Sequence, residues 1–330
     1  MVVLVWNDDY FNYLLNSTVK FEDRFHIISG FVGGDSRFYY NMDDTIIATI
    51  YAGLISGGVK FGSIMSLVGI YIYVEISEFI FGNKLIGVFI LNIMVATLIL
   101  KYVNVRHPKE AVLLFCLFPL SLNYILVPNK ELFGLLFLVL LASENKLLKK
   151  KSILIPLSLI RDSYAAQLAW FAGASVIGTR LMFVIVFSVI PLILPDNYFS
   201  ETALTDGQSS GFITQHANDL LQIPLVSIFG FVLKIILGLF SGLIITPTEQ
   251  LTVIKVQYFL CAIINVLFLG KIAISHKLRK HLKQDGAKFA LGCTVYALFM
   301  CLAPGNPARF LGPLTFMFLY KLLTWKKNAA

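Results

Sequence analysis

Four short groups of charged and aromatic residues interrupt long apolar runs and hold the residue types that could perform chemistry. They are the segments 33–40 (GGDSRFYY), 128–131 (PNKE), 161–164 (RDSY) and 306–309 (NPAR). Their carboxylates are candidates for a general base. Their arginine and lysine side chains suit a diphosphate, because they offer charged hydrogen-bond donors to phosphate oxygens. Together the groups are suited to moving a sugar from a lipid diphosphate to an acceptor.

Three of these groups also have a purely structural interpretation. Lys130 and Glu131 can begin a helix, with their long side chains reaching along the membrane surface. Arg161 and Asp162 can form a neutral pair within the bundle, and Arg309 can bind lipid headgroups. The residue types alone leave both interpretations open for each group.

The group that contains Asp35 is the hardest to explain by packing. Asp35 lies near Arg37, Tyr39 and Tyr40, and two glycines precede it. Paired glycines let the backbone bend tightly, so the polar side chains can gather in a loop. The histidines and cysteines show no metal-ligand spacing, and the four cysteines lie within apolar runs. We therefore expect a site built on carboxylates and cations.

The composition predicts that a bundle of membrane helices positions these groups. Of the 330 residues, 57% are hydrophobic and only 14% are charged, whereas a soluble domain is about 25% charged. Several apolar runs approach the roughly 20 residues that cross a bilayer. They are continuous rather than alternating, which excludes an outer-membrane barrel. We expect one all-α, polytopic membrane domain over residues 1–330 with roughly 9–11 membrane helices, some short or re-entrant.

The positions of the basic residues predict the orientation of this bundle. The net charge is +8, but Lys and Arg gather in short breaks between apolar runs, as the positive-inside rule expects. This distribution excludes a nucleic-acid-binding face. The breaks near 101–109, 146–151 and 276–288 and the C-terminus should be cytoplasmic. The loops expected outside are those near 20–44, 128–131, 196–222, 246–253 and 303–307.

Most helices expected from apolar runs have clear limits, but three segments remain open. The clear runs are 84–100, 110–127, 132–142, 254–273, 288–302 and 308–323. Glu75 and Glu78 share one helical face and make a full span over 63–82 doubtful. Segment 152–176 is either one span or two short helices that meet at Arg161 near the outer surface. Segment 223–246 is re-entrant, interfacial or a broken hairpin, with a plain span as the alternative.

Short motifs in these loops resemble those of a known superfamily. GGDSRFYY at 33–40 resembles the Asp-containing first outer loop of the GT-C superfamily of membrane glycosyltransferases. PNKE at 128–131, which opens an apolar run, resembles the second acidic motif of those enzymes. Arg161 and the closing NPARFLGPL are similar to features of bacterial GT-C-like proteins, among them Wzy-type O-antigen and capsule polymerases.

The resemblance implies a GT-C-like polymerase of the bacterial inner membrane, with its site facing the periplasm. Its substrate would be an undecaprenyl-diphosphate-linked oligosaccharide, and its partners would include a flippase and a chain-length regulator. No cofactor is implied, and the use of a divalent metal stays open. Asp35 would be the general base, with Glu131 as the second catalytic carboxylate. The residues implied to bind sugar or diphosphate are Arg37, Tyr39, Tyr40, Lys130, Arg161, Asp162 and Arg309.

Two rival functions make different predictions. A flippase for the same lipid-linked sugars predicts charged residues deep in a central cavity and a pair of related halves. The sequence shows no internal repeat. A membrane assembly protein without a site predicts that alanine at Asp35 or Arg161 leaves function intact.

Overall fold

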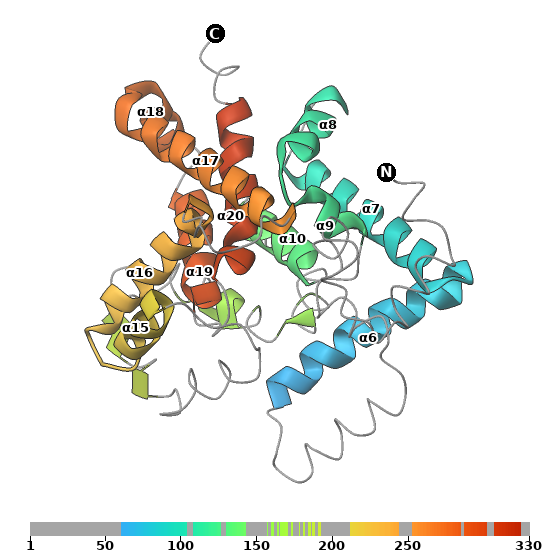
Figure 1. Ribbon diagram of the computed structural model, residues 1–330, viewed down its shortest axis with the longest axis horizontal. Helices are drawn as coiled ribbons and strands as arrows, with labels where there is room; N and C mark the ends of the chain where they lie inside the picture. The colour runs from blue at the N-terminus through green and yellow to red at the C-terminus, as the bar shows by residue number, and fades with distance from the viewer. Residues whose placement is uncertain are drawn as a thin grey trace.

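The computed structural model describes the chain in seven stretches and several single positions. The stretches are 61–103, 108–126, 130–142, 212–243, 253–284, 287–301 and 307–324, and single positions or short pieces are described between 157 and 192. All regular structure in these residues is helical (Figure 1). The expected all-α class is therefore confirmed for the part of the chain that the structure describes.

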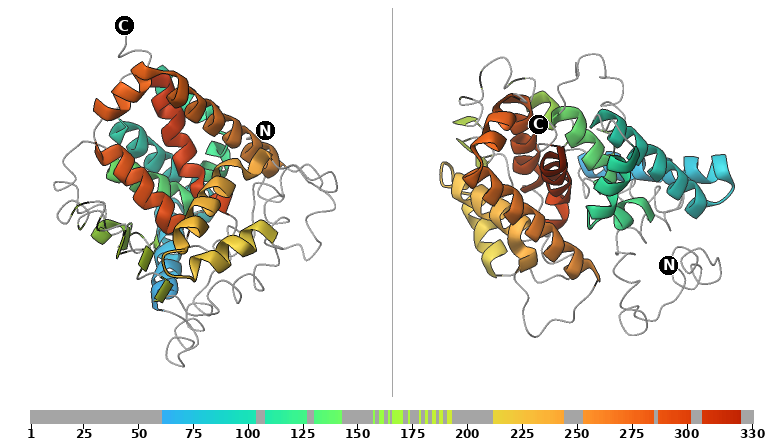
Figure 2. Two further views of the ribbon diagram at one scale, coloured as in Figure 1. Left: turned by 90° about the vertical axis from the view of Figure 1, so that its left-hand side faces the viewer. Right: turned by 90° about the horizontal axis from the view of Figure 1, so that it is seen from above.

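Helices α6 (Phe61–Phe81) and α7 (Lys84–Tyr102) form a sharply bent pair at the edge of the molecule (Figure 2). The bend is 109°, and Gly82 adopts a φ of 69° there, a conformation that glycine tolerates best. Lys84 lies 2.9 Å from a carboxylate oxygen of Glu75 and 3.3 Å from one of Glu78. The two acidic residues of α6 are thus paired with the first residue of α7.

The run expected over 110–127 is two helices, α8 (Pro108–Leu117) and α9 (Ser121–Leu126). Pro119 lies in the turn between them. Proline lacks a backbone N–H and its ring clashes with the preceding turn, so a helix does not continue through it without a kink or break. The expectation of one continuous segment was wrong at this residue.

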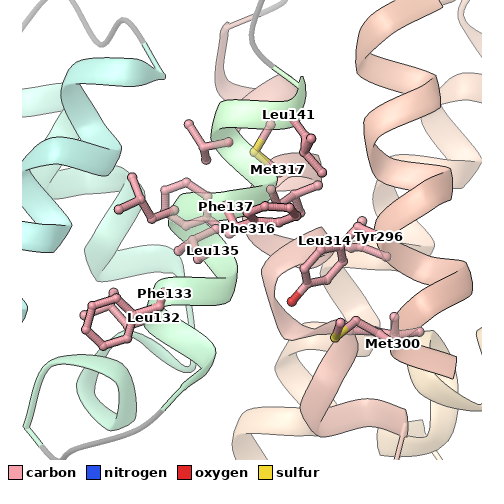
Figure 3. Packing of buried hydrophobic residues seen from close by; sticks show 14 of the residues in the cluster. Leu132, Phe133, Leu135, Phe137, Leu141, Tyr296, Met300, Leu314, Phe316 and Met317 are labelled. Atoms are coloured by element: carbon pink, nitrogen blue, oxygen red, sulfur yellow. The ribbon is translucent and has the colours of Figure 1, made fainter. Parts of the chain in front are cut away.

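Helix α10 (Glu131–Ala142) occupies the centre of the molecule, and all of its residues are buried. It packs against α7, α19 (Ala287–Cys301) and α20 (Pro307–Thr324). Figure 3 shows apolar side chains of α10, α20 and α19 packed together in one cluster. At 1.5 Å per residue, its 12 residues are about 18 Å long. The helix is therefore too short to cross a bilayer of about 30 Å by itself.

Helices lie in two segments whose structure was expected to be a loop, for 196–222, or a re-entrant, interfacial or broken segment, for 223–246. Helix α15 (Phe212–Leu221) lies within the expected outer loop 196–222 and packs against α16 (Ser227–Phe240). A short 3-10 helix, η3 (Ser241–Leu243), follows α16. Within the described residues of segment 223–246, α16 is one unbroken helix.

The C-terminal helices agree with the expected runs. Helices α17 (Val253–Ile274), α19 and α20 coincide with the runs 254–273, 288–302 and 308–323 to within one residue at each end. The basic break expected at 276–288 is itself helical over α18 (His276–Gln284).

One helix in the described residues is long and apolar enough to cross a membrane, namely Val256–Ile274. The bent pair Val68–Phe81 and Ile86–Tyr102 raises the number to two if the pair forms a single span. Four further apolar helices are shorter: Glu131–Ala142, Ser227–Phe240, Phe289–Cys301 and Leu311–Thr324. The expected count of membrane helices stays a prediction.

Candidate functional site

The first residue of the central helix α10 is an acid inside the protein. Glu131 is only 4% exposed. The backbone carbonyl of Lys130 accepts a hydrogen bond from the N–H of Gly134 at 2.9 Å, so the helix begins here. An acid in the first turn interacts favourably with the helix dipole. Burial of a carboxylate is costly, however, unless charged or polar groups surround it.

Arg161 supplies the opposite charge. Arg161 lies three residues before Tyr164, whose hydroxyl approaches Gly134 of α10. The Arg161 guanidinium is near enough to Glu131 for the two charges to attract each other. The Arg161 side chain is half-buried, and its Nη1 atom lies out of contact with solvent. Two residues predicted from separate sequence groups are thus brought into one site.

Tyr164 and Tyr296 converge on the helix turn that follows Glu131. Both side chains are buried, at 0% and 1% exposure. A Cβ atom at Gly134 would lie 2.6 Å from the Tyr164 hydroxyl and 2.9 Å from the Tyr296 hydroxyl. Figure 3 shows Tyr296 pointing from α19 toward α10. Only glycine at this position therefore allows the two hydroxyls to approach α10 so closely.

A third tyrosine reaches the same region from α9. Tyr124 is 4% exposed, and it lies close enough to Glu131 for the carboxylate charge to disfavour ionisation of its hydroxyl. Its hydroxyl also lies 2.6 Å from where a Cβ atom would stand at Gly312 of α20. We name Glu131, Arg161, Tyr124, Tyr164 and Tyr296 the Glu131 cluster.

Gln167 lies three residues after Tyr164 and is fully buried. Neither its amide oxygen nor its amide nitrogen has a hydrogen-bond partner in the part of the chain that the structure describes. A buried polar group left in this state costs about 1–3 kcal/mol. Such groups in native proteins call for an explanation, and a bound polar ligand would supply one here.

The predicted site residues fall into three classes. Glu131 and Arg161 meet in the cluster, and Lys130 adjoins it with a half-buried side chain. Arg309 lies in the first turn of α20, where only the backbone is described. The remaining predicted residues lie outside the described residues: Asp35, Arg37, Tyr39, Tyr40 and Asp162.

The sequence reasoning missed Tyr124, Tyr296 and Gln167, whereas Tyr164 belonged to the group 161–164. The missed residues lie in or beside apolar runs, where a polar group needs a partner. The chain has 14 tyrosines, so residue type alone does not select those that face the cluster. Their convergence depends on how α9 and α19 pack around α10.

The cluster combines a carboxylate, a guanidinium and three phenol hydroxyls in a region shielded from water. Electrostatic interactions are stronger in such a region than at a surface. The guanidinium can bind phosphate oxygens with paired donors, and the hydroxyls can bind sugar or phosphate oxygens. Within the described residues, no group of three or more His, Cys, Asp or Glu side chains is arranged to hold a metal ion.

Comparisons with known proteins give no family for this chain. No protein-family model, curated protein or solved structure matches it. The resemblance to the GT-C superfamily therefore stays a prediction from short motifs.

Proposed function

We propose that the protein is a polytopic bacterial membrane glycosyltransferase of the lipid-linked oligosaccharide polymerase type. In this proposal it transfers an oligosaccharide from an undecaprenyl-diphosphate carrier to an acceptor sugar during surface-polysaccharide synthesis. The observation that carries it is the buried carboxylate of Glu131 at the start of a fully buried helix. The hydroxyls of Tyr164 and Tyr296 converge on Gly134 in the next turn of that helix, and Arg161 lies three residues before Tyr164. Glu131 and Arg161 come from the motifs that resemble the GT-C pattern.

The outward faces of the helices support a membrane environment. Large apolar side chains are exposed on α6, α16 and α17, including Phe79 at 90%, Phe229 at 66% and Ile274 at 87%. Polar side chains such as those of Asn92 and Gln167 are fully buried. Soluble proteins rarely expose extensive apolar patches. A lipid environment accounts for both the exposed apolar side chains and the buried polar ones, because polar groups of membrane proteins face the interior of the helix bundle.

The proposed reaction is a displacement at the anomeric carbon of the transferred sugar. The acceptor hydroxyl oxygen forms the new carbon–oxygen bond while the bond to the diphosphate oxygen breaks. The diphosphate leaves with the electron pair of that bond, and Arg161 offsets its negative charge. The acceptor proton passes to a carboxylate, a role that the resemblance assigns to Asp35. Glu131 orients Arg161 and binds the sugar beside it.

The three tyrosines fit the same reaction. Their hydroxyls can donate to sugar or phosphate oxygens without adding charge. The Tyr164 ring stacks on Phe137 with centroids 4.4 Å apart and an interplanar angle of 10°, which fixes the direction of its hydroxyl. Held donors are more effective than mobile ones, because they need not reorganise during the reaction.

Complementation of a strain that lacks the gene tests the proposal. The variants are Glu131→Gln, Arg161→Lys and Asp35→Asn, compared at equal membrane expression. Arg161→Lys keeps the charge but loses the paired donors. The matched control is Glu110→Gln, which removes an acid from the first turn of α8. Polymer length is read on a gel, together with the amount of lipid-linked single repeat units.

We expect each cluster variant to lose roughly 10²–10³-fold in transfer rate, as when one preorganised donor is removed from a catalytic site. Single repeat units should accumulate, whereas Glu110→Gln should make polymer of normal length. Normal polymer from Glu131→Gln and Arg161→Lys would contradict the proposed site. Normal polymer from Asp35→Asn alone would remove Asp35 from the reaction and leave the cluster in place.

A second candidate function is transport of the same lipid-linked sugars. Lys234 favours it, because this ionisable residue is fully buried in a helix that packs against α19 and α20. Charged residues inside a bundle often mark a transport path. The side on which repeat units accumulate separates the two functions. Accumulation on the periplasmic face in Glu131→Gln supports transfer, and accumulation on the cytoplasmic face supports transport.

A further inference from the structure

Helix α18 presents a row of cations to its surroundings. Its sequence is HKLRKHLKQ, and the side chains of His276, Lys277, Arg279 and Lys280 are exposed. Leu278 is fully buried and Leu282 packs against the hydrophobic core. These leucines are four residues apart and therefore lie on one face of the helix. The helix is thus fixed to the body by its leucines and displays its cations outward.

Two hydrogen bonds fix α18 at the end of α17. The Leu278 N–H donates to the Ser275 Oγ at 3.2 Å, so Ser275 caps the helix. Arg279 Nη1 donates to the backbone carbonyl of Ala273 at 2.9 Å. Figure 1 shows α18 as a separate short helix at the outside of the molecule, directly after α17. The cations are therefore held in place rather than carried on a loose tail.

The cationic helix follows directly on an exposed apolar surface. Along the last turns of α17, Leu267 is 59% exposed and Ile274 is 87% exposed. α17 is also the described helix that is long and apolar enough to cross a membrane. The exposed cations begin at Lys271 in the last turn of α17 and continue along α18. An apolar helix surface followed by exposed cations matches the change from acyl chains to charged headgroups at the edge of a bilayer.

We infer that the exposed cations of α18 bind the phosphate groups of anionic phospholipids at the cytoplasmic surface of the membrane. We name Lys277, Arg279 and Lys280 the α18 basic face. Anionic headgroups complement its charge, and acyl chains complement the adjoining surface of α17. This inference rests on the membrane part of the proposed function and is independent of the transfer reaction.

Lipid selectivity of the purified full-length chain tests the inference. The protein in neutral detergent is given equal amounts of phosphatidylglycerol and phosphatidylcholine, and bound lipid is counted by native mass spectrometry. Each basic residue near an anionic surface strengthens binding by about fivefold at low salt. Lys277→Gln combined with Lys280→Gln should therefore lower the preference for phosphatidylglycerol by about 25-fold. Lys277→Arg combined with Lys280→Arg should keep it.

Three further binding measurements, on a site variant, at high salt and with inorganic phosphate as competitor, test the inference. Glu131→Gln should bind phosphatidylglycerol as the wild type does, so failure of the lipid site and failure of the transfer site are distinguishable. Raising the salt to about 1 M shortens the screening length to about 3 Å and should weaken the preference. An unchanged preference in the double glutamine variant, or none in the wild type, would overturn the inference. Equal displacement by inorganic phosphate would show a general anion site and overturn it too.

Discussion

Gly134→Ala is the substitution that tests the geometry of the Glu131 cluster most directly. The added methyl group would lie 2.6 Å from the Tyr164 hydroxyl and 2.9 Å from the Tyr296 hydroxyl. Both rings are buried, and Tyr164 is stacked on Phe137. Neither hydroxyl can swing aside freely, so the methyl group must displace the rings or α10 itself.

The expected cost follows from two opposing effects. Overpacking of a filled core costs about 1–3 kcal/mol, whereas alanine is favoured over glycine within a helix by about 1 kcal/mol. Gly270→Ala in α17 isolates the second effect, because a Cβ atom there meets no atom within 4 Å. We therefore expect Gly134→Ala to be less stable than Gly270→Ala by about 1–3 kcal/mol.

Thermal unfolding of both variants in the same detergent measures this difference. For a chain of this size, about 1–3 kcal/mol corresponds to a difference of several degrees in Tm. Polymer synthesis should fall in Gly134→Ala, because the hydroxyls move, and remain normal in Gly270→Ala. If the two variants unfold at the same temperature and both make normal polymer, the two tyrosines do not converge on Gly134.

Three further substitutions test the packing around the site by thermal unfolding. Gly87→Ala places a methyl group against the backbone of α6 and should destabilise by more than Gly134→Ala, because backbone cannot move aside as a side chain does. Asn92→Ala removes the hydrogen bond that Asn92 accepts from Tyr73 and the one that it donates to the Ile125 carbonyl, while Tyr73 still donates to the Val88 carbonyl. The loss of the two hydrogen bonds should cost about 1–3 kcal/mol in total. Thr97→Ala on the exposed face of α7 is its control. Ser275→Ala removes the cap of α18 and should cost about 1 kcal/mol, with no loss if the cap is not formed.

The sequence predicted the long apolar helices well. α17, α19 and α20 begin and end within a residue of the expected runs. Continuous apolar residues bounded by proline, glycine or charged residues define such helices with little dependence on tertiary structure. Two departures from the expected runs, one missed break and one expected break that is helical, have local causes. Pro119 separates α8 from α9, and the leucine spacing in α18 makes a basic segment helical.

The candidate site was predicted only in part. Glu131 and Arg161 stood out because charges among apolar residues are costly and need a reason. Tyr296 lies in a mostly apolar helix and gave no such indication. Tyrosine is common in such helices, because its ring is apolar and only its hydroxyl needs a polar partner. Its position beside Gly134 depends on the packing of α19 against α10, which the spacing within either helix does not determine.

The two charges of the Glu131 cluster need not add to the stability of the protein. Replacing a buried, interacting pair of charges by apolar residues of similar size is often neutral or stabilising by about 1–4 kcal/mol. Removing one partner alone costs about 3–5 kcal/mol, because the remaining charge is left uncompensated. Glu131→Met should therefore unfold at a lower temperature than the wild type. Glu131→Met combined with Arg161→Met should recover the lost stability.

Polymer synthesis should not recover with stability in this double variant. If Glu131 and Arg161 bind sugar and diphosphate, both methionine variants make single repeat units only, although the double variant is folded. Thermal unfolding and polymer length, measured on the same membranes, separate the two roles. A double variant that restores polymer would show that the pair serves packing alone. One that is less stable than Glu131→Met would show that the two charges do not compensate each other.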